Sequence, residues 1–177
     1  MKSPRRVFLV GPMGAGKTTL GRQLARAMNV EFVDSDHEIE RRTGADIPWI
    51  FDIEGEEGFR RRETEVIDEL TQNDELVLAT GGGAVLKLEN RQFLRERGIV
   101  VYLHASVEKL FQRTAKDRNR PLLQTDNPKE KLKNLMGERE PLYRDVADIV
   151  INTGAHSLRY TVDQILNEIK KRAELNQ

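Results

Sequence analysis

The chain has no cysteine among its 177 residues, which excludes disulfides and a thiol nucleophile and gives no sign of an oxidising compartment. It has no net charge either, because 29 Lys and Arg residues balance 29 Asp and Glu residues. We therefore expect no nucleic-acid partner, since such proteins carry a broad basic surface, whereas an anionic small molecule is compatible with this balance. Long apolar runs are also missing, and none approaches the roughly 20 residues of a membrane helix.

The N-terminus opens with the basic segment "MKSPRR", but the apolar run that follows is only Val7 to Val10 and ends at a Gly-Pro break. A secretory signal peptide needs a longer apolar segment. We therefore expect a cytoplasmic protein with no membrane partner. The length is that of one domain, which can bury a core without metals or disulfides.

Five short runs rich in Val, Ile, Leu and Phe alternate with longer polar segments that have helical spacing. These runs are "RRVFLV", "VEFVD", "ELVLAT", "GIVVYLH" and "DIVINT". Between the first two, Leu20, Leu24 and Met28 follow one stripe of a helix. This rhythm predicts an α/β fold with three layers, in which a five-stranded parallel sheet lies between helices. All strands of such a sheet end at one edge, where ligands bind.

Two connections are longer than this topology requires. The first, from Ser35 to Thr71, is expected to carry about three helices, one capped by Asp46 and another running from Glu56 to Leu70. The second, from Ala115 to Pro128, is polar, basic in its first half and bracketed by prolines. Long insertions at the ligand edge are often substrate-holding subdomains or lids, although the second segment alone is also typical of a solvated loop.

A phosphate-binding motif follows the first predicted strand. The segment "GPMGAGKT", from Gly11 to Thr18, fits G-x-x-x-x-G-K-[ST] with a strand before it and a helix after it. Its glycines let backbone N–H groups converge on phosphate oxygens at the positive end of the helix. Lys17 would reach the β- and γ-phosphates, and the Thr18 hydroxyl would bind Mg²⁺. The motif predicts binding of a nucleoside triphosphate.

The metal-linked acid that most such proteins carry at the end of a second core strand is missing after "LVLAT". Carboxylates at the expected edge come instead from "VEFVDSDHE", as Asp34 and Asp36. Asp34, nearer the strand, is the better metal candidate, and Asp36 is left to face the acceptor. The alternative for Asp36 is a cap on the helix that follows.

Three consecutive glycines, Gly81 to Gly83, stand where that acid would be. Glycines lose more backbone entropy on folding than other residues and offer no side chain for packing, so we expect exposed backbone to be useful at this position. The triplet is compatible with a second phosphate cradle, with a close seat for another ligand, or with a tight turn.

Arginines supply the acceptor candidates. Arg60 and Arg62 both border the apolar face of a predicted helix, and helical geometry does not choose between them; Arg139 precedes a proline in "GEREPLY". Such a run is often a solvated surface, but two converging arginines would suit a carboxylate acceptor. The chain has no Asn-Lys-x-Asp segment of a GTPase and no second phosphate loop of a motor. It therefore favours phosphoryl transfer to a small molecule.

Taken in order, the motifs resemble the shikimate kinase family of nucleoside-monophosphate-kinase-like proteins. The resemblance covers nearly the whole chain, through "FLVGPMGAGKTT", "DSD", "GEEGFRRRE", "TGGG", "RPLL" and "REPLY". It implies one P-loop kinase domain over residues 1–177, with a substrate-binding insertion at about 35–71 and a lid at about 115–128. It also implies a monomer that transfers the ATP γ-phosphoryl group to the 3-hydroxyl of shikimate, toward chorismate and the aromatic amino acids.

Carried over position by position, the resemblance implies roles for individual residues. Arg60, chosen over Arg62, and Arg139 would bind the shikimate carboxylate, while Gly82 and Asp36 would contact the ring, with Asp36 orienting the attacking hydroxyl. Trp49, Phe51 and Phe59 would lie near the acceptor wall, although an ordinary small core explains them as well.

On the nucleotide side, the resemblance implies that Mg²⁺ is held by Thr18 and Asp34, and that Lys17 and the lid residue Arg120 act on the transferring phosphoryl group. Arg113 would lie beside the adenine. His156 stands where relatives often carry a polar residue near the adenine, and it is alternatively a surface histidine. The residues implied to bind ATP are Gly14, Ala15, Gly16, Lys17, Thr18, Thr19, Arg113, Arg120 and His156.

Overall fold

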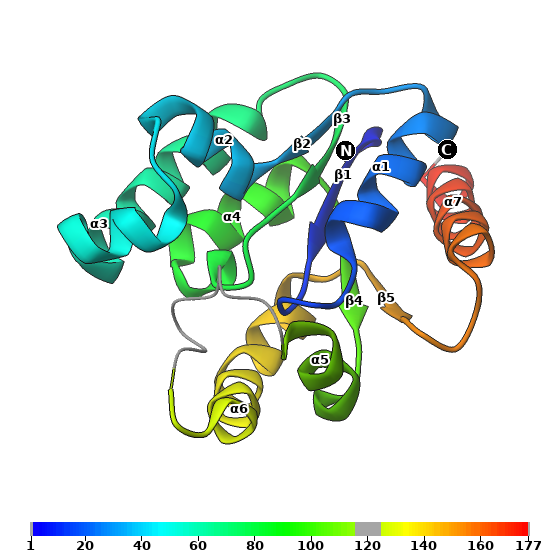
Figure 1. The fold of residues 1–177 in the computed structure, drawn as a ribbon. Coiled ribbons are helices and arrows are strands. Elements are labelled where there is room, and N and C mark those ends of the chain that lie inside the picture. The colour runs from blue at the N-terminus through cyan, green and yellow to red at the C-terminus, as the bar shows by residue number, and fades with distance from the viewer. Residues whose placement is uncertain (1, 116–124, 177) are drawn as a thin grey trace.

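The computed structural model describes residues 2–115 and 125–176, and these form a parallel sheet between two layers of helices (Figure 1). The sheet has five strands in the order β2-β3-β1-β4-β5, and every neighbouring pair is parallel. The strands are β1 (Ser3–Val10), β2 (Phe32–Asp34), β3 (Leu76–Ala79), β4 (Gly98–His104) and β5 (Ile149–Asn152). The prediction of a five-stranded parallel sheet in a three-layer α/β fold is confirmed.

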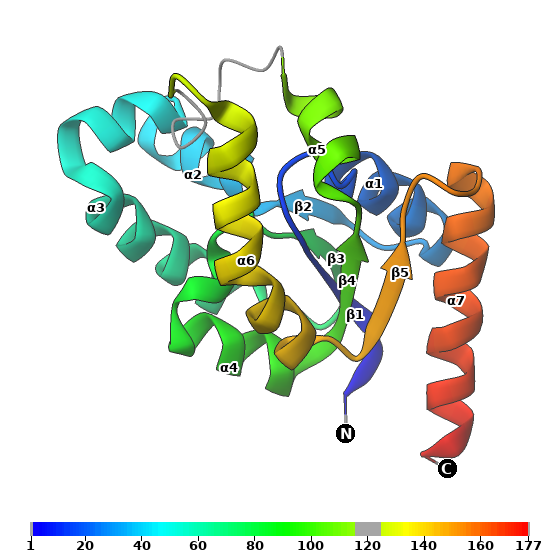
Figure 2. The same cartoon turned by 90° about the horizontal axis from the view of Figure 1, so that it is seen from below.

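Helices cover both faces of the sheet, as Figure 2 shows from below. On one face lie α1 (Lys17–Met28) and α7 (Leu158–Leu175), which contact each other and the strands beneath them. On the other lie α4 (Leu88–Arg97) and α6 (Pro128–Val146), with α5 (Val107–Thr114) beside α6 and a short 3₁₀ helix, η1 (Ala84–Leu86), before α4. Within the described residues, no helix is long and apolar enough to span a membrane.

The core follows from the apolar runs of the sequence. Val7 to Val10 in β1 are fully buried, because this central strand has neighbours on both edges and helices on both faces. Leu20 and Leu24 of α1 are buried against the sheet, and Met28 packs at the edge of the same core. A strand that is buried on both faces has no reason to alternate polar and apolar residues, which explains why the run is continuous.

The first insertion contains α2 (Ser35–Thr43) and α3 (Ile47–Leu70). Gly55 interrupts α3 with non-helical angles (φ 72°, ψ 175°), so the insertion holds three helical pieces, as expected. Asp46 caps α3 by accepting a hydrogen bond of 2.9 Å from the Trp49 N–H, which confirms the predicted cap.

The cap of α2 differs from the alternative considered for Asp36. Asp34 is the N-cap residue, and its Oδ1 accepts hydrogen bonds from the backbone N–H groups of Asp36 (3.0 Å) and His37 (3.2 Å). The helix therefore begins two residues earlier than a cap at Asp36 would allow. Asp36 lies in the first turn of α2, and its side chain is not used to start the helix.

Candidate active site

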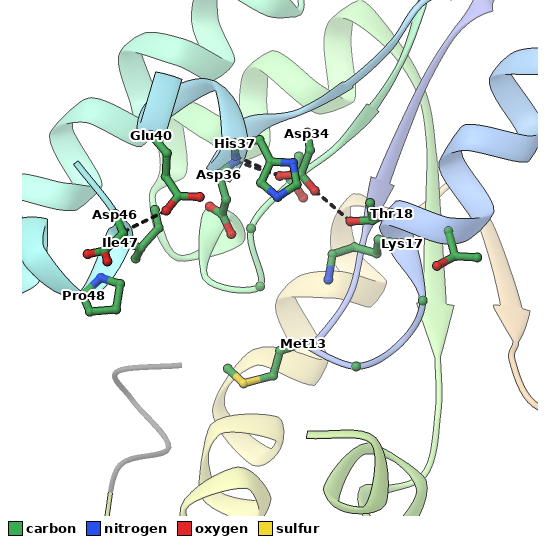
Figure 3. Close-up of a pocket in the computed structure, with 16 residues that line it drawn as sticks. Met13, Lys17, Thr18, Asp34, Asp36, His37, Glu40, Asp46, Ile47 and Pro48 are labelled. Atoms are coloured by element: carbon green, nitrogen blue, oxygen red, sulfur yellow. Dashed lines mark hydrogen bonds between the residues drawn. The ribbon is translucent and has the colours of Figure 1, made fainter. Parts of the chain in front are cut away.

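A cleft with a volume of about 510 Å³ opens at the carboxyl edge of the sheet (Figure 3). Residues of the phosphate loop, Gly11–Thr18, form one wall together with Thr19. The start of α2, the start of α3 and the first two residues of the glycine triplet, Gly81–Gly83, form the other wall, which we call the acceptor wall after its predicted role. The loop and the triplet follow β1 and β3, and Asp34 is the last residue of β2. Parallel strands bring these three ends to one edge. The side chains of Lys17 and Asp36 both extend into the space between the walls.

The phosphate loop has the backbone conformation that its glycines permit. Gly14 (φ 81°) and Gly16 (φ 93°) are left-handed, and Gly16 is also the N-cap of α1. A side chain at Gly16 would meet no atom within 4 Å, so this part of the loop faces open space. Lys17 Nζ donates to the carbonyl oxygens of Gly11 (2.7 Å) and Pro12 (2.9 Å), which lays the cation across the loop. Loop backbone, helix terminus and ammonium group thus converge, as phosphate binding requires.

Thr18 and Asp34 are brought together from different elements. Thr18 Oγ1, at the start of α1, donates a hydrogen bond of 2.8 Å to Asp34 Oδ2, at the end of β2. A hydroxyl and a carboxylate oxygen side by side are donors that suit Mg²⁺. Among the residues that the structure describes, no three His, Cys, Asp or Glu side chains are grouped so as to hold a metal ion. The pair therefore fits an ion that takes its remaining ligands from nucleotide phosphates and water.

The remaining nucleotide-side predictions have different outcomes. Arg113, on α5, donates 2.8 Å from Nη1 to the Gly14 carbonyl and so lies against the phosphate loop. His156 is exposed in the loop after β5, where its ring lies 4.3 Å from that of Tyr160. The same loop passes Arg113, because a Cβ on Gly154 would stand 3.2 Å from Arg113 Nη2. Arg120 and most of the predicted lid lie outside the described residues.

Two buried arginines lie against the glycine triplet, behind the residues that line the acceptor wall. Arg60, on α3, is 6% exposed, and Arg139, on α6, is 3% exposed. Arg60 Nη1 donates 2.9 Å to Glu63 Oε1, and its Nη2 donates 3.3 Å to Glu56 Oε1. Buried guanidinium groups need partners of opposite charge, and Glu63 provides one within the wall.

The structure distinguishes the three arginines of "FRRRE". Arg60 turns inward, whereas Arg61 and Arg62 pair at the surface with Glu57 and Glu54. The surface interpretation of the run therefore holds for two members and fails for the third. The choice of Arg60 over Arg62 agrees with this geometry.

Glu63 is a site residue that sequence reasoning missed. It is completely buried, and burial raises the pKa of its carboxyl group despite the opposing effect of Arg60 and Arg139. It follows Arg60 by three residues on the apolar face of α3, beside Phe59 and Val66. An acid in the middle of an apolar stripe is the signal that could have identified it.

The glycine triplet makes room for these side chains. None of its residues has a positive φ, so a left-handed turn is not the reason for the glycines. A Cβ on Gly83 would stand 2.3 Å from Arg60 Nη2, and one on Gly81 would stand 2.7 Å from both Asp36 Oδ1 and Glu63 Oε2. A Cβ on Gly82 would lie 3.6 Å from Arg139 Nη1 and 3.4 Å from the Met13 nitrogen of the phosphate loop. The triplet is where the predicted acceptor residues approach one stretch of bare backbone.

The aromatic residues near this wall divide between core and surface. Phe59 is buried, and its ring centroid lies 5.0 Å from that of half-buried Phe51. Trp49 is 60% exposed at the start of α3. Core packing thus accounts for two of the three rings.

Comparison with known proteins gives one consistent result. The sequence profile of the family described as "Shikimate kinase" matches residues 13–170. The shikimate kinases of Methylococcus capsulatus and Vibrio campbellii are 58% and 56% identical to the chain over 171 and 172 residues; each match covers 97% of this chain, and 96% and 100% of the relatives. A solved structure of shikimate kinase from Acinetobacter baumannii in complex with shikimate is 57% identical, with a TM-score of 0.93, covering 95% of this chain and 94% of that one. The P-loop kinase fold and this similarity over nearly the full length show that the chain belongs to the shikimate kinase family.

Proposed function

We propose that this protein carries out the reaction of its family: it transfers the γ-phosphoryl group of ATP to the 3-hydroxyl of shikimate, giving shikimate 3-phosphate and ADP. The product leads to chorismate and the aromatic amino acids. One observation supports this best. Two buried arginines, one from α3 and one from α6, lie against the glycine triplet, whose Gly82 is next to the phosphate loop. The arrangement suits an acceptor that carries both a carboxylate and a hydroxyl group.

The carboxylate would bind to Arg60 and Arg139. Arg60 and Arg139 are buried cations, and an acceptor carboxylate would add a further partner of opposite charge beside Glu63. The guanidinium fork binds such a group through two parallel hydrogen bonds. Glu63 holds Arg60 by a 2.9 Å contact, so that the arginine need not reorganise when the acceptor arrives.

Asp36 would accept hydrogen bonds from the ring hydroxyls and orient the attacking oxygen. It lies beside Gly81, at the start of α2, and extends into the cleft that Lys17 enters from the other wall. Bare backbone at Gly82 would allow the compact ring to sit against the edge of the sheet. Positioning of this kind contributes most of the catalysis in phosphoryl transfer.

The nucleotide side would act by placing positive charge. An ATP-dependent kinase requires a divalent metal, and we assign Mg²⁺ to Thr18 and Asp34, where it would neutralise charge on the phosphates. Residues 14–19 would hold the phosphates, with Lys17 stabilising the charge of the transferring group. We assign Arg120 to the same charge and residues 115–128 to the lid, and Arg113 and His156 to the adenine side.

Residues 1–177 would work as one kinase domain, a cytoplasmic monomer whose insertion at about 35–71 binds the acceptor. The parts of that insertion that line the cleft support this division. Size-exclusion chromatography with light scattering tests the monomer, and a mass near 20.3 kDa is expected.

The function is tested by coupled measurement of ADP release with shikimate, gluconate and nucleoside monophosphates as parallel acceptors. We expect saturable turnover with shikimate alone, abolished by EDTA and restored by Mg²⁺. Preference for another acceptor would overturn the substrate, and ATP binding without turnover on any acceptor would show a nucleotide-binding module instead.

A further inference from the structure

The glycine triplet is held in place by two buried hydroxyl groups. The Gly81 N–H donates 3.1 Å to Ser35 Oγ, and the Tyr143 hydroxyl donates 2.5 Å to the Gly82 carbonyl oxygen. Both Ser35 and Tyr143 are fully buried. Between these two contacts, the Gly81 carbonyl accepts 3.1 Å from the Ala84 N–H. Three successive peptide units are therefore each fixed by a hydrogen bond, which sets the orientation of the Gly81–Gly82 peptide that faces the cleft.

Each hydroxyl group belongs to a helix that also carries an acceptor residue. Ser35 directly precedes Asp36 on α2, and Tyr143 follows Arg139 by one turn on α6. The positive charge of Arg139 acts to lower the pKa of the Tyr143 hydroxyl group, against the larger effect of burial. The triplet thus joins the end of β3 to two helices that are far apart in the sequence.

We propose that Tyr143 and Ser35 are positioning residues, which keep Gly82, Arg139 and Asp36 at the mutual distances that the acceptor requires. They set the affinity for shikimate through these neighbours. Both side chains are fully buried and both hydroxyl groups bond to the backbone of the triplet, so neither residue is expected to contact substrate. The inference rests on the proposed assignment of Gly82, Arg139 and Asp36 to the acceptor.

A purely structural role for Tyr143 would depend on its ring. The ring stacks on Tyr102, with centroids 5.1 Å apart and planes 21° apart, in the layer between β4 and α6. A phenylalanine at either position keeps this stack. The Tyr102 hydroxyl contacts Glu140 and not the triplet. Tyr102→Phe is therefore a matched control, because it removes a hydroxyl group from the same stack.

The test compares Tyr143→Phe with Tyr102→Phe by steady-state kinetics, with thermal unfolding of both. For Tyr143→Phe we expect a rise of about tenfold in the shikimate KM, as for the loss of one buried hydrogen bond, with kcat and the ATP KM within about twofold. Tyr102→Phe should leave all three within about twofold. Burial raises the pKa of Tyr143 to about 12, so its hydroxyl group stays protonated and the KM ratio should be constant from about pH 6 to 9.

Ser35→Ala provides a second variant, because it removes the oxygen that accepts from Gly81 without enlarging the side chain. We expect the same selective rise in the shikimate KM. Any of three results would overturn the inference. The shikimate KM could be unchanged in both variants, the KM values for shikimate and ATP could rise equally, or Tyr102→Phe could have the same effect as Tyr143→Phe. Turnover of the unmodified protein on shikimate is measured in the same assay. Its absence would reject the proposed function, whereas normal turnover with unaffected variants would reject only the positioning role.

Discussion

The two walls of the cleft are built in different ways. The phosphate loop is one contiguous segment of eight residues, and its geometry comes from backbone angles at Gly14 and Gly16. The acceptor wall is assembled from side chains of α2, α3 and α6 around the glycine triplet. The first wall uses backbone that any nucleotide phosphate can meet, and the second uses buried charge of one specific pattern. The nucleotide side therefore depends on one short segment whose backbone suits any nucleotide phosphate. The proposed acceptor side depends on contacts between segments that are far apart in the sequence.

The largest expected effect is on kcat, from a substitution on the nucleotide side of the cleft. Lys17→Ala removes the cation that spans the Gly11 and Pro12 carbonyls, and we expect kcat to fall by about 10²–10³-fold. The fold should persist, because Lys17 is only half-buried at the edge of the loop. Coupled kinetics and thermal unfolding test this, with Lys171→Ala on the outer surface of α7 as the control. Normal turnover of Lys17→Ala would remove Lys17 from the mechanism.

The next largest effect is on the shikimate KM, from a substitution on the acceptor side. Arg60→Ala leaves Glu63 buried without its 2.9 Å partner and removes half of the carboxylate site. We expect the shikimate KM to rise by about 30-fold or more, with the ATP KM nearly unchanged. Arg62→Ala, two residues away on the surface, should change neither. A rise in the ATP KM without a rise for shikimate would place the acceptor elsewhere.

Alanine substitutions in the triplet sharpen the comparison, since its members have different neighbours: Gly83 lies against Arg60, whereas Gly82 also lies against the phosphate loop. A Cβ at Gly83 meets only the Arg60 guanidinium within 2.5 Å, whereas a Cβ at Gly82 lies against both Met13 of the phosphate loop and Arg139. Gly83→Ala should raise the shikimate Kd by roughly tenfold and spare ATP binding, since displacement of Arg60 weakens one charge-assisted contact. Gly82→Ala should act on shikimate before ATP, but less selectively. Titration calorimetry with each substrate separates the two variants, and equal losses in Gly83→Ala would contradict the division.

The smallest effect concerns an ion pair at the surface of the same insertion. Hydrogen bonds from Arg41 and Arg42 lower the pKa of Glu38 from 4.5 to about 2. A carboxyl group with a lowered pKa stabilises the fold above the unfolded value, and this contribution is lost as the pH falls from about 4.5 toward 2. Glu38→Gln should cost less than about 1 kcal/mol at pH 7, and the difference should vanish near pH 2. Urea denaturation at several pH values measures it; a constant difference would contradict the linkage.

The fold and the nucleotide side could be predicted because their signals are local. Val7 to Val10 read as a buried strand, and the eight residues after them carry the complete phosphate motif. The cap at Asp46 could also be predicted, because a capping side chain accepts a hydrogen bond from a backbone N–H only a few residues away. Asp34 had a local signal too, because its place at the end of the strand favoured it over Asp36 as the metal candidate. Its role as the N-cap of α2 was not expected.

The acceptor side could be predicted from the residues only as a set of alternatives. Arg60 and Arg62 both border the apolar face on a helical wheel. They differ in burial, because Arg60 lies against Glu63 and the glycine triplet, which follows β3 further along the chain, whereas Arg62 pairs at the surface. Glu63 and Tyr143 gain their importance from contacts across such distances. Arg60 was selected by the resemblance to a family, which assigned no role to Glu63 or Tyr143. Long-range charge burial is the part of the site that local patterns do not encode.

The order of the strands has a consequence for local unfolding. The phosphate loop follows β1, an eight-residue strand in the middle of the sheet, whereas Asp34 and α2 follow β2, a three-residue strand at its edge. Edge elements open at lower free energy than central ones. Amide hydrogen exchange should therefore be fast in β2 and α2 while β1 stays protected. We therefore expect the part of the acceptor wall that α2 forms to open and reclose while the phosphate loop keeps its shape.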